Sequence, residues 1–241
     1  MGFRPPPPRC QCDPKCKNKP LPKQAFCKVH QRRCDRKAPP SGYESSYQPL
    51  EYNQHLGRMF ANNCYGYATG FDELPKDCTK DKCDAPFPQP GLSSGHPSWE
   101  NIQGKRCPDV MARALGDIPG SYIARFTQKC KAGTRKIAFV VDPNRDYHVL
   151  RQDKVRVHPL MPDSPPTAYW SDKSGTTKVK DVDSSKRPIY DPSLARFYTE
   201  DGVLQYTYPC GYMCIPAKKP KLTRGSSRKR IQKTRKRRTH R

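Results

Sequence analysis

The pattern of apolar and polar residues predicts three strands in the second half of the chain. The longest apolar run, at 136–141, is rich in β-branched residues, which is typical of a buried strand. Turn-forming residues follow at 142–145, and a second strand is predicted at 147–152. A late segment rich in aromatic residues, 206–215, predicts a further strand.

A helix and two long loops complete the predicted elements. Residues 107–115 predict a helix, because Pro108 stands at an early position, four apolar residues share one face and Gly116 follows. Segments 74–98 and 154–169 have no periodic pattern and are predicted to be loops. Strands and a helix mixed in this way predict an α+β domain, with loops that carry the specificity.

Charge divides the chain into three parts. The 241 residues carry a formal net charge of +24, but residues 1–40 hold +9, residues 217–241 hold +13 and the middle holds only +2. We therefore expect a Pro-rich start with a Cys/His module at 1–40, an α+β domain at 41–216 and a disordered basic tail at 217–241. A nearly neutral domain excludes a uniformly basic nucleic-acid-binding fold.

No segment of the sequence predicts a membrane span or a secretion signal. The apolar run at 136–141 is far shorter than the ~20 residues that a spanning helix needs. The first residues, MGFRPPPP, lack the apolar core of a signal peptide. The expectation is a soluble, non-secreted chain.

Cysteine and histidine residues near the N-terminus have the spacing of a zinc module. They read C-x-C-x3-C and, ten residues later, C-x2-H-x3-C, and such short ligand pairs supply the tetrahedral site that zinc needs. About 25 residues with almost no core also need a metal in order to fold. The alternative is a disulfide knot. The six candidates are Cys10, Cys12, Cys16, Cys27, His30 and Cys34, and the preferred set is Cys12, Cys16, Cys27 and His30, with Cys10 and Cys34 as substitutes.

Six further cysteines follow along the chain, and their pairing cannot be deduced from sequence. Disulfides are one interpretation, and a second metal site that uses four of them is another. These residues are Cys78, Cys83, Cys107, Cys130, Cys210 and Cys214.

Cys64 and His148 are candidates for a nucleophile and its general base. Two Asn residues precede Cys64, so it is predicted to start a helix, where the helix dipole favours a thiolate. His148 lies on the predicted strand at 147–152. Asp146, on the same strand face, and Asp172 are both candidates to orient the imidazole. The alternative is a chance pair that serves only packing.

Motifs along the middle part resemble those of a known family. They are Asn63–Ala68, Gln89–Gly91, Asp146–His148, Arg151–Asp153, Trp170–Ser171, Lys173, Gly175–Thr176, Ile189–Pro192 and Cys210–Tyr212. In this order they resemble a papain-fold family of large DNA viruses, some phages and bacteria, which is related to cell-wall amidases and endopeptidases. The N-terminal Cys/His segment is similar to short modules of the same viruses.

This resemblance implies a papain-like fold, in which a helix carrying Cys64 packs on an antiparallel sheet carrying His148. It also implies that Cys64 is the nucleophile, His148 the base and Asp172 the third polar group, although the family has His at this last position. The backbone N–H of Cys64 would donate to the oxyanion.

The function implied by the resemblance is a virion-associated thiol hydrolase of an amide or peptide bond, from a large DNA virus. The alternative is a non-enzymatic minor capsid protein with a papain-like fold, anchored through its zinc-binding and basic ends. Either way the expected partners are capsid or other virion proteins. The expected location is the virus particle, with the nucleus or cytoplasm of the host cell during infection.

The basic tail contains no aromatic residue and therefore offers charge alone. Such a segment binds nucleic-acid phosphates or an acidic protein surface, and a nuclear-targeting signal has the same composition. The residues proposed for this binding are Arg228, Lys229, Arg230, Lys233, Arg235, Lys236, Arg237 and Arg238.

Overall fold

The apolar run predicted as a strand lies at the centre of a five-stranded antiparallel sheet. β2 (Thr134–Asp142) pairs on one side with β3 (Asp146–Gln152) through the predicted turn, and on the other side with β5 (Tyr208–Pro216). β1 (Tyr122–Ala124) and β4 (Trp170–Asp172) form the edges, so the strand order is β1-β5-β2-β3-β4. This computed structural model describes residues 5, 7–71, 73–76, 78–79, 81–99 and 104–224.

Four helices precede the sheet in the described part of the chain. Three are short and follow one another closely: α1 (Leu50–Asn53), α2 (Leu56–Ala61) and α3 (Cys64–Thr69). The fourth, α4 (Cys107–Asp117), is the predicted amphipathic helix. The α+β class expected from the sequence is thereby confirmed.

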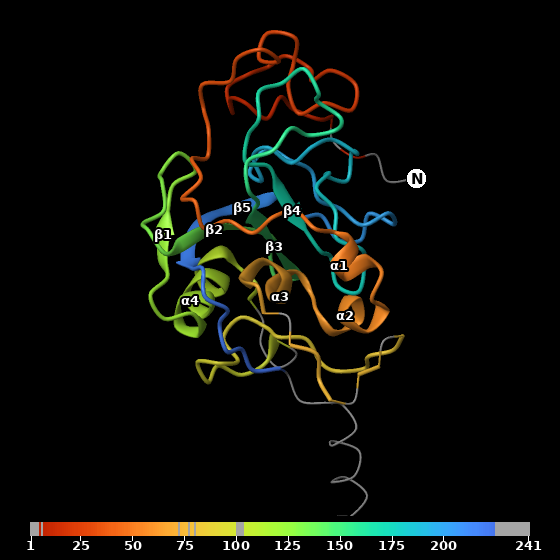
Figure 1. Ribbon diagram of the computed structural model, residues 1–241, viewed down its shortest axis with the longest axis vertical. Helices are drawn as coiled ribbons and strands as arrows, with labels where there is room; N and C mark the ends of the chain where they lie inside the picture. Colours follow the sequence, from red (N-terminus) through yellow and green to blue (C-terminus); the bar gives the residue numbers. More distant parts are fainter. Residues whose placement is uncertain are drawn as a thin grey trace, which may run out of the picture.

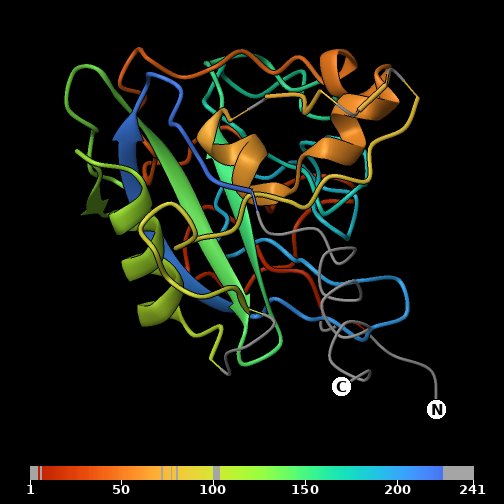
Figure 2. The same cartoon turned by 90° about the horizontal axis from the view of Figure 1, so that it is seen from below.

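Alternate residues of β2 point into two different hydrophobic clusters, as the period of a strand requires. Phe139 and Val141 belong to a cluster that also contains residues of α3 and α4. Ala138 and Val140 belong to a second cluster, which includes Trp170 and residues of the N-terminal segment. Figure 2 shows α4 lying along β2 and β5. Both faces of the sheet are therefore covered, which explains why the central strand is apolar throughout.

α4 runs through Gly116 instead of ending before it, and Asp117 explains the difference. The Asp117 carboxylate accepts hydrogen bonds from the Tyr65 hydroxyl at 3.1 Å, from the Gly91 N–H at 2.7 Å and from the Ser94 N–H at 2.9 Å. These bonds tie the end of α4 to α3 and to the loop that precedes α4. A buried carboxylate with several donors holds the helix terminus in place of a glycine cap.

The N-terminal segment 10–34 has no helix or strand and packs on the rest of the protein. Gln11 is fully buried; its Nε2 donates to the Pro188 carbonyl at 3.0 Å, and its Oε1 accepts from the Tyr190 N–H at 2.7 Å. Figure 1 shows this segment in red at one end of the molecule, beside the loop at 154–169. The segment therefore shares a core with the sheet.

The long predicted loops contain no helix or strand longer than a single bridge in their described residues. Residues 217–224, the start of the predicted tail, lie against the body, where the Thr223 N–H donates to Ser93 Oγ at 2.7 Å. The eight basic tail residues proposed for binding, 228–238, lie outside the described residues. No helix in the described part is long and apolar enough to cross a bilayer.

Candidate functional site

Asn63 places Cys64 at the first position of α3. Its side-chain Oδ1 accepts from the Gly66 N–H at 3.0 Å, and its Nδ2 donates to the Pro88 carbonyl at 2.9 Å. This N-cap fixes the direction in which the helix starts. Gly66 lies in a crowded place, since a Cβ there would be 3.1 Å from both Asn62 Oδ1 and Pro88 Cγ, and these atoms would have to shift.

His148 lies in the middle of β3, where β4 brings a carboxylate to its ring. His148 Nε2 is 2.6 Å from Asp172 Oδ2, and both residues are buried. The rings of Phe197 and Tyr206 lie 5.6 Å and 5.3 Å from the imidazole, centroid to centroid. The imidazole is therefore held by one carboxylate and two aromatic rings.

Cys64 and His148 line the same pocket, and the thiol acts on the imidazole electrostatically. Burial alone would lower the pKa of His148. The hydrogen bond to Asp172 and the influence of Cys64, together with the negative charges of both groups, outweigh burial and raise this pKa from 6.5 to about 9. An imidazole beside a thiol can act as its general base or acid.

The structure brings together Cys64, His148 and Asp172 and leaves Asp146 in another role. Asp146 Oδ2 accepts from the Tyr206 hydroxyl at 2.8 Å, and Asp146 Oδ1 lies 3.7 Å from Lys105 Nζ. Asp172 is thus the carboxylate that contacts the imidazole. The arrangement can move a proton between a thiol and an imidazole that a carboxylate orients.

Sequence reasoning assigned no role to Lys173, which is completely buried next to this centre. Its ammonium donates to the carbonyls of Met59, Asn62 and Gly175 at 2.5–2.7 Å. Burial lowers the pKa of Lys173 to about 8, although the nearby Cys64 acts in the opposite direction. Lys173 therefore ties the chain just before the nucleophile to the loop after β4. A lysine next to Asp172 carried no signal in sequence, because its burial depends on the tertiary fold.

The thiol–imidazole pair lines a pocket of about 300 Å³. Its walls include four aromatic residues, one glutamine and the Asp146–Lys105 ion pair. The Gln89 Oε1 accepts from the Tyr147 hydroxyl at 3.4 Å, so its amide group stays in the wall. The lining residues are Asn63, Cys64, Phe87, Gln89, Trp99, Lys105, Asp146, Tyr147, His148, Ser174, Gly175 and Tyr206.

A second cluster lies in the N-terminal segment and can hold a metal ion. It consists of Cys10, Cys16, Cys27 and His30, whose ligand atoms all lie within 4.8 Å of one another. Cys10 Sγ is 3.3 Å and Cys27 Sγ is 3.4 Å from His30 Nδ1, and the Cys16 and Cys27 sulfurs are 3.9 Å apart. Ligands at about 2.3 Å from a tetrahedral zinc ion are separated by roughly 3.7 Å, so the cluster fits this geometry.

The structure exchanges one member of the preferred zinc set. Cys12 forms a disulfide with Cys34, and Cys10 takes its place beside His30. The spacing alone could not separate these cysteines, because the six candidates lie within 25 residues. The segment thus contains both a disulfide and a group of side chains that can hold a metal ion, and the two use different cysteines.

Three more disulfides form, and two of them join distant parts of the chain. Cys107–Cys210 links the start of α4 to β5, and Cys130–Cys214 links the loop after β1 to the same strand. Cys78–Cys83 closes a short loop. Four disulfides in one chain are typical of proteins in an oxidising environment.

The fold and the site define a disulfide-stapled α+β protein with a buried thiol–imidazole–carboxylate centre. No family model matches the chain, and no solved structure matches it. Over 135 residues it is 33% identical to insoluble matrix shell protein 1 of Ruditapes philippinarum. The aligned region covers 56% of this chain and 70% of that protein. The chain belongs to the family of this shell matrix protein.

This relationship corrects the viral assignment. The resemblance to a papain-like family of large DNA viruses is wrong, and so are the functions taken from it, a virion-associated hydrolase and a minor capsid protein. The expected location in virus particles or in an infected cell is wrong for the same reason. The motifs around Cys64 and His148 reflect what a thiol centre requires, and such constellations recur in unrelated proteins.

Proposed function

We propose that this chain is a component of an extracellular matrix of the shell type, and that it forms covalent links there by thiol-dependent acyl transfer. The observation that carries the proposal is the pair of Cys64 and His148 in the wall of a pocket, with the Asp172 carboxylate behind the imidazole. The name of the relative, an insoluble matrix protein, supports a reaction that joins chains together. The net charge of +13 in residues 217–241 suits an acidic matrix partner.

The proposed reaction joins a primary carboxamide, as in a glutamine side chain, to a primary amine, as in lysine. The Cys64 thiolate adds to the carboxamide carbon, and the His148 imidazolium gives its proton to the nitrogen that leaves as ammonia. A thioester remains on Cys64. The amine then adds to the thioester and loses a proton to His148, and the thiolate leaves. The products are one substituted amide and one ammonia.

The pocket favours an amine over water as the second reactant. Aromatic side chains such as Trp99 and Tyr147 can pack along the methylene stem of a lysine. The Asp146 carboxylate in the wall attracts an ammonium group. The N–H of Cys64 and the amide of Gln89 are the donors that we assign to the oxyanion.

The arrangement of the elements fits this chemistry as well. A helix that starts with the nucleophile and packs on an antiparallel sheet carrying the base is the arrangement of papain-like thiol enzymes. We therefore propose a papain-like architecture for the body.

Amine incorporation tests the proposed reaction. Purified protein is incubated with a glutamine-containing test protein and a fluorescent primary amine, and the product is followed by gel fluorescence and mass spectrometry. We expect labelling with a mass gain equal to the amine minus ammonia, and no labelling with Cys64→Ser. His148→Gln should also be inactive. Folded wild-type protein that incorporates no amine refutes the proposal.

We further propose that the cluster of Cys10, Cys16, Cys27 and His30 binds one structural zinc ion. Three thiolates and one imidazole are soft donors that suit zinc. These four side chains would fill all four coordination positions of a tetrahedral zinc ion, as in a structural site. Elemental analysis of protein purified without chelators should give one zinc per chain. Protein with reduced cluster cysteines and no bound metal, even after zinc is added, contradicts this assignment.

A further inference from the structure

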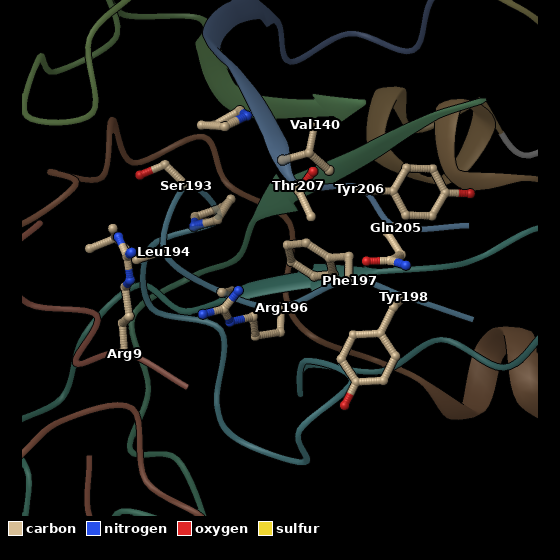
Figure 3. A pocket seen from close by; sticks show the side chains of 13 residues that line it. Arg9, Val140, Ser193, Leu194, Arg196, Phe197, Tyr198, Gln205, Tyr206 and Thr207 are labelled. Atoms are coloured by element: carbon tan, nitrogen blue, oxygen red, sulfur yellow. The ribbon is translucent and has the colours of Figure 1, made fainter. Parts of the chain in front are cut away.

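A second pocket, of about 190 Å³, lies next to the thiol centre. It is lined by residues 192–198 and 205–207, with Arg9, Val140 and Pro209 (Figure 3). Tyr206 lines both this pocket and the pocket of Cys64. Phe197, in the new pocket, also contacts the ring of His148. One layer of aromatic side chains therefore separates the two pockets.

Two arginines give this second pocket an excess of positive charge. Arg9 and Arg196 both line it, and neither forms an ion pair in the part of the chain that the structure describes. Burial, and then the positive charges of Arg9 and Arg187, lower the pKa of Arg196. The nearest carboxylate, Asp183, is bound at 2.8 Å by Arg187. An anion in the pocket would balance this charge.

One hydrogen-bond donor of Arg196 is also left over. Its terminal nitrogen donates to the Pro7 carbonyl, but its Nε is buried without a partner. Buried donors in proteins are nearly always satisfied, so the hydrogen bonding of Arg196 within the described protein is incomplete. Figure 3 shows the guanidinium groups of Arg9 and Arg196 on one side of the pocket and the rings of Phe197 and Tyr198 on the other.

The chemistry of the walls selects the class of anion. A guanidinium presents a planar fork that matches a carboxylate, and aromatic rings opposite accept a short methylene stem. An Asp or Glu side chain has both parts, and the pocket volume admits one such group. An acidic chain also complements a protein with a net charge of +24.

We propose that the pocket of Arg9 and Arg196 binds an acidic side chain of the polypeptide that is presented to Cys64. This inference rests on the proposed acyl transfer for its substrate, because the shared wall residue Tyr206 places the acidic side chain beside the reacting group. It predicts that the preferred acyl donor carries Asp or Glu close in sequence to the reacting glutamine.

Peptide binding tests the inference separately from the chemistry. Binding of a fluorescent glutamine peptide flanked by Glu is measured by anisotropy in the full chain with Cys64→Ser, which cannot react. The reference peptide carries Gln in place of each Glu. Arg196→Gln should weaken binding of the acidic peptide by about tenfold or more, because a charge-assisted hydrogen bond is lost. The matched control is Arg32→Gln, an exposed residue outside the pocket, which should change it less than about twofold.

The outcomes are distinct for the two proposals. Equal binding of the acidic and neutral peptides, or no effect of Arg196→Gln, overturns the inference. If Arg196→Gln does not fold, as judged by near-UV circular dichroism, the exposed Arg9→Gln replaces it with the same expectation. If sulfate or phosphate displaces the acidic peptide at lower concentrations than acetate does, the pocket is a site for tetrahedral oxyanions and the inference of a carboxylate site is overturned. Retained Arg-dependent binding without amine incorporation by wild-type protein counts against acyl transfer alone.

Discussion

Replacing Asp172 by Asn should remove a pH-dependent part of the stability of this protein. The imidazole of His148 is buried, and its contact with the Asp172 carboxylate, at 2.6 Å, stabilises the protonated ring. In the variant, the carboxylate charge is gone while burial remains. The pKa of His148 should then fall, because burial disfavours the charged ring.

The magnitude follows from the pKa of His148 in the folded protein. A rise from 6.5 to about 9 corresponds to about 3 kcal/mol in favour of the folded state, at about 1.4 kcal/mol per pKa unit. Because the folded-state pKa is raised, this contribution is fully present below pH 6.5. It is lost as the pH rises through about 9. Asp172→Asn should therefore be less stable than wild type by about 3 kcal/mol at pH 6, and the difference should shrink by pH 10.

Urea unfolding with intact disulfides, at several pH values between 6 and 10, measures this difference. Asp146→Asn is the matched control, because it removes a carboxylate on the same strand that does not contact the imidazole. Its stability curve should run parallel to that of wild type. If the Asp172→Asn curve also runs parallel to wild type across this range, the reasoning about the buried imidazolium is refuted.

Three further predictions concern residues of the thiol centre and of the Cys/His cluster. Lys173→Met leaves three carbonyls without their donor, so it should lower the unfolding free energy by about 2–4 kcal/mol. It should also slow the alkylation of Cys64 by iodoacetamide, and an unchanged rate would mean that Lys173 does not position Cys64. Cys10→Ser should abolish stoichiometric zinc binding in elemental analysis, whereas the double variant Cys12→Ser/Cys34→Ser should still bind zinc. The reverse result would favour the ligand set expected from spacing, in which Cys12 is a ligand and Cys10 is not. Gly66→Ala should destabilise the protein by about 1–3 kcal/mol in thermal melts, because the new Cβ would crowd Asn62 and Pro88. This effect should outweigh the better helix propensity of Ala, and a stabilised variant would show that the site has room.

The elements that sequence could predict are those whose signal is local. The apolar run at 136–141 and the turn after it determine the central hairpin, because burial on both faces of a strand leaves an unbroken apolar pattern. The helix at 107–115 followed from its apolar face. Its true end at Asp117 did not, since that carboxylate depends on donors from residues 65–94.

The site was predictable to the same extent. Residue types and helix-capping signals indicated Cys64 and His148, but a choice between Asp146 and Asp172 needed the register of β3 against β4. Lys173 and the two arginines of the second pocket gave no local signal, because each acts through contacts with segments far away in sequence. The family of the protein was the least predictable property, since motifs report chemistry more than ancestry.

The twelve cysteines, all in the described part of the chain, account for one another in a way that bears on the proposed chemistry. Eight form disulfides and three belong to the cluster with His30, so Cys64 is the one cysteine outside both groups. In an oxidising matrix, a reactive thiol survives only if it has no neighbouring thiol to pair with and is shielded from solvent. Cys64 is 6% exposed, and the other cysteines are already committed. Under the proposed thiol chemistry, the disulfides and the Cys/His cluster protect Cys64 as well as the fold, which is the condition that such chemistry outside the cell requires.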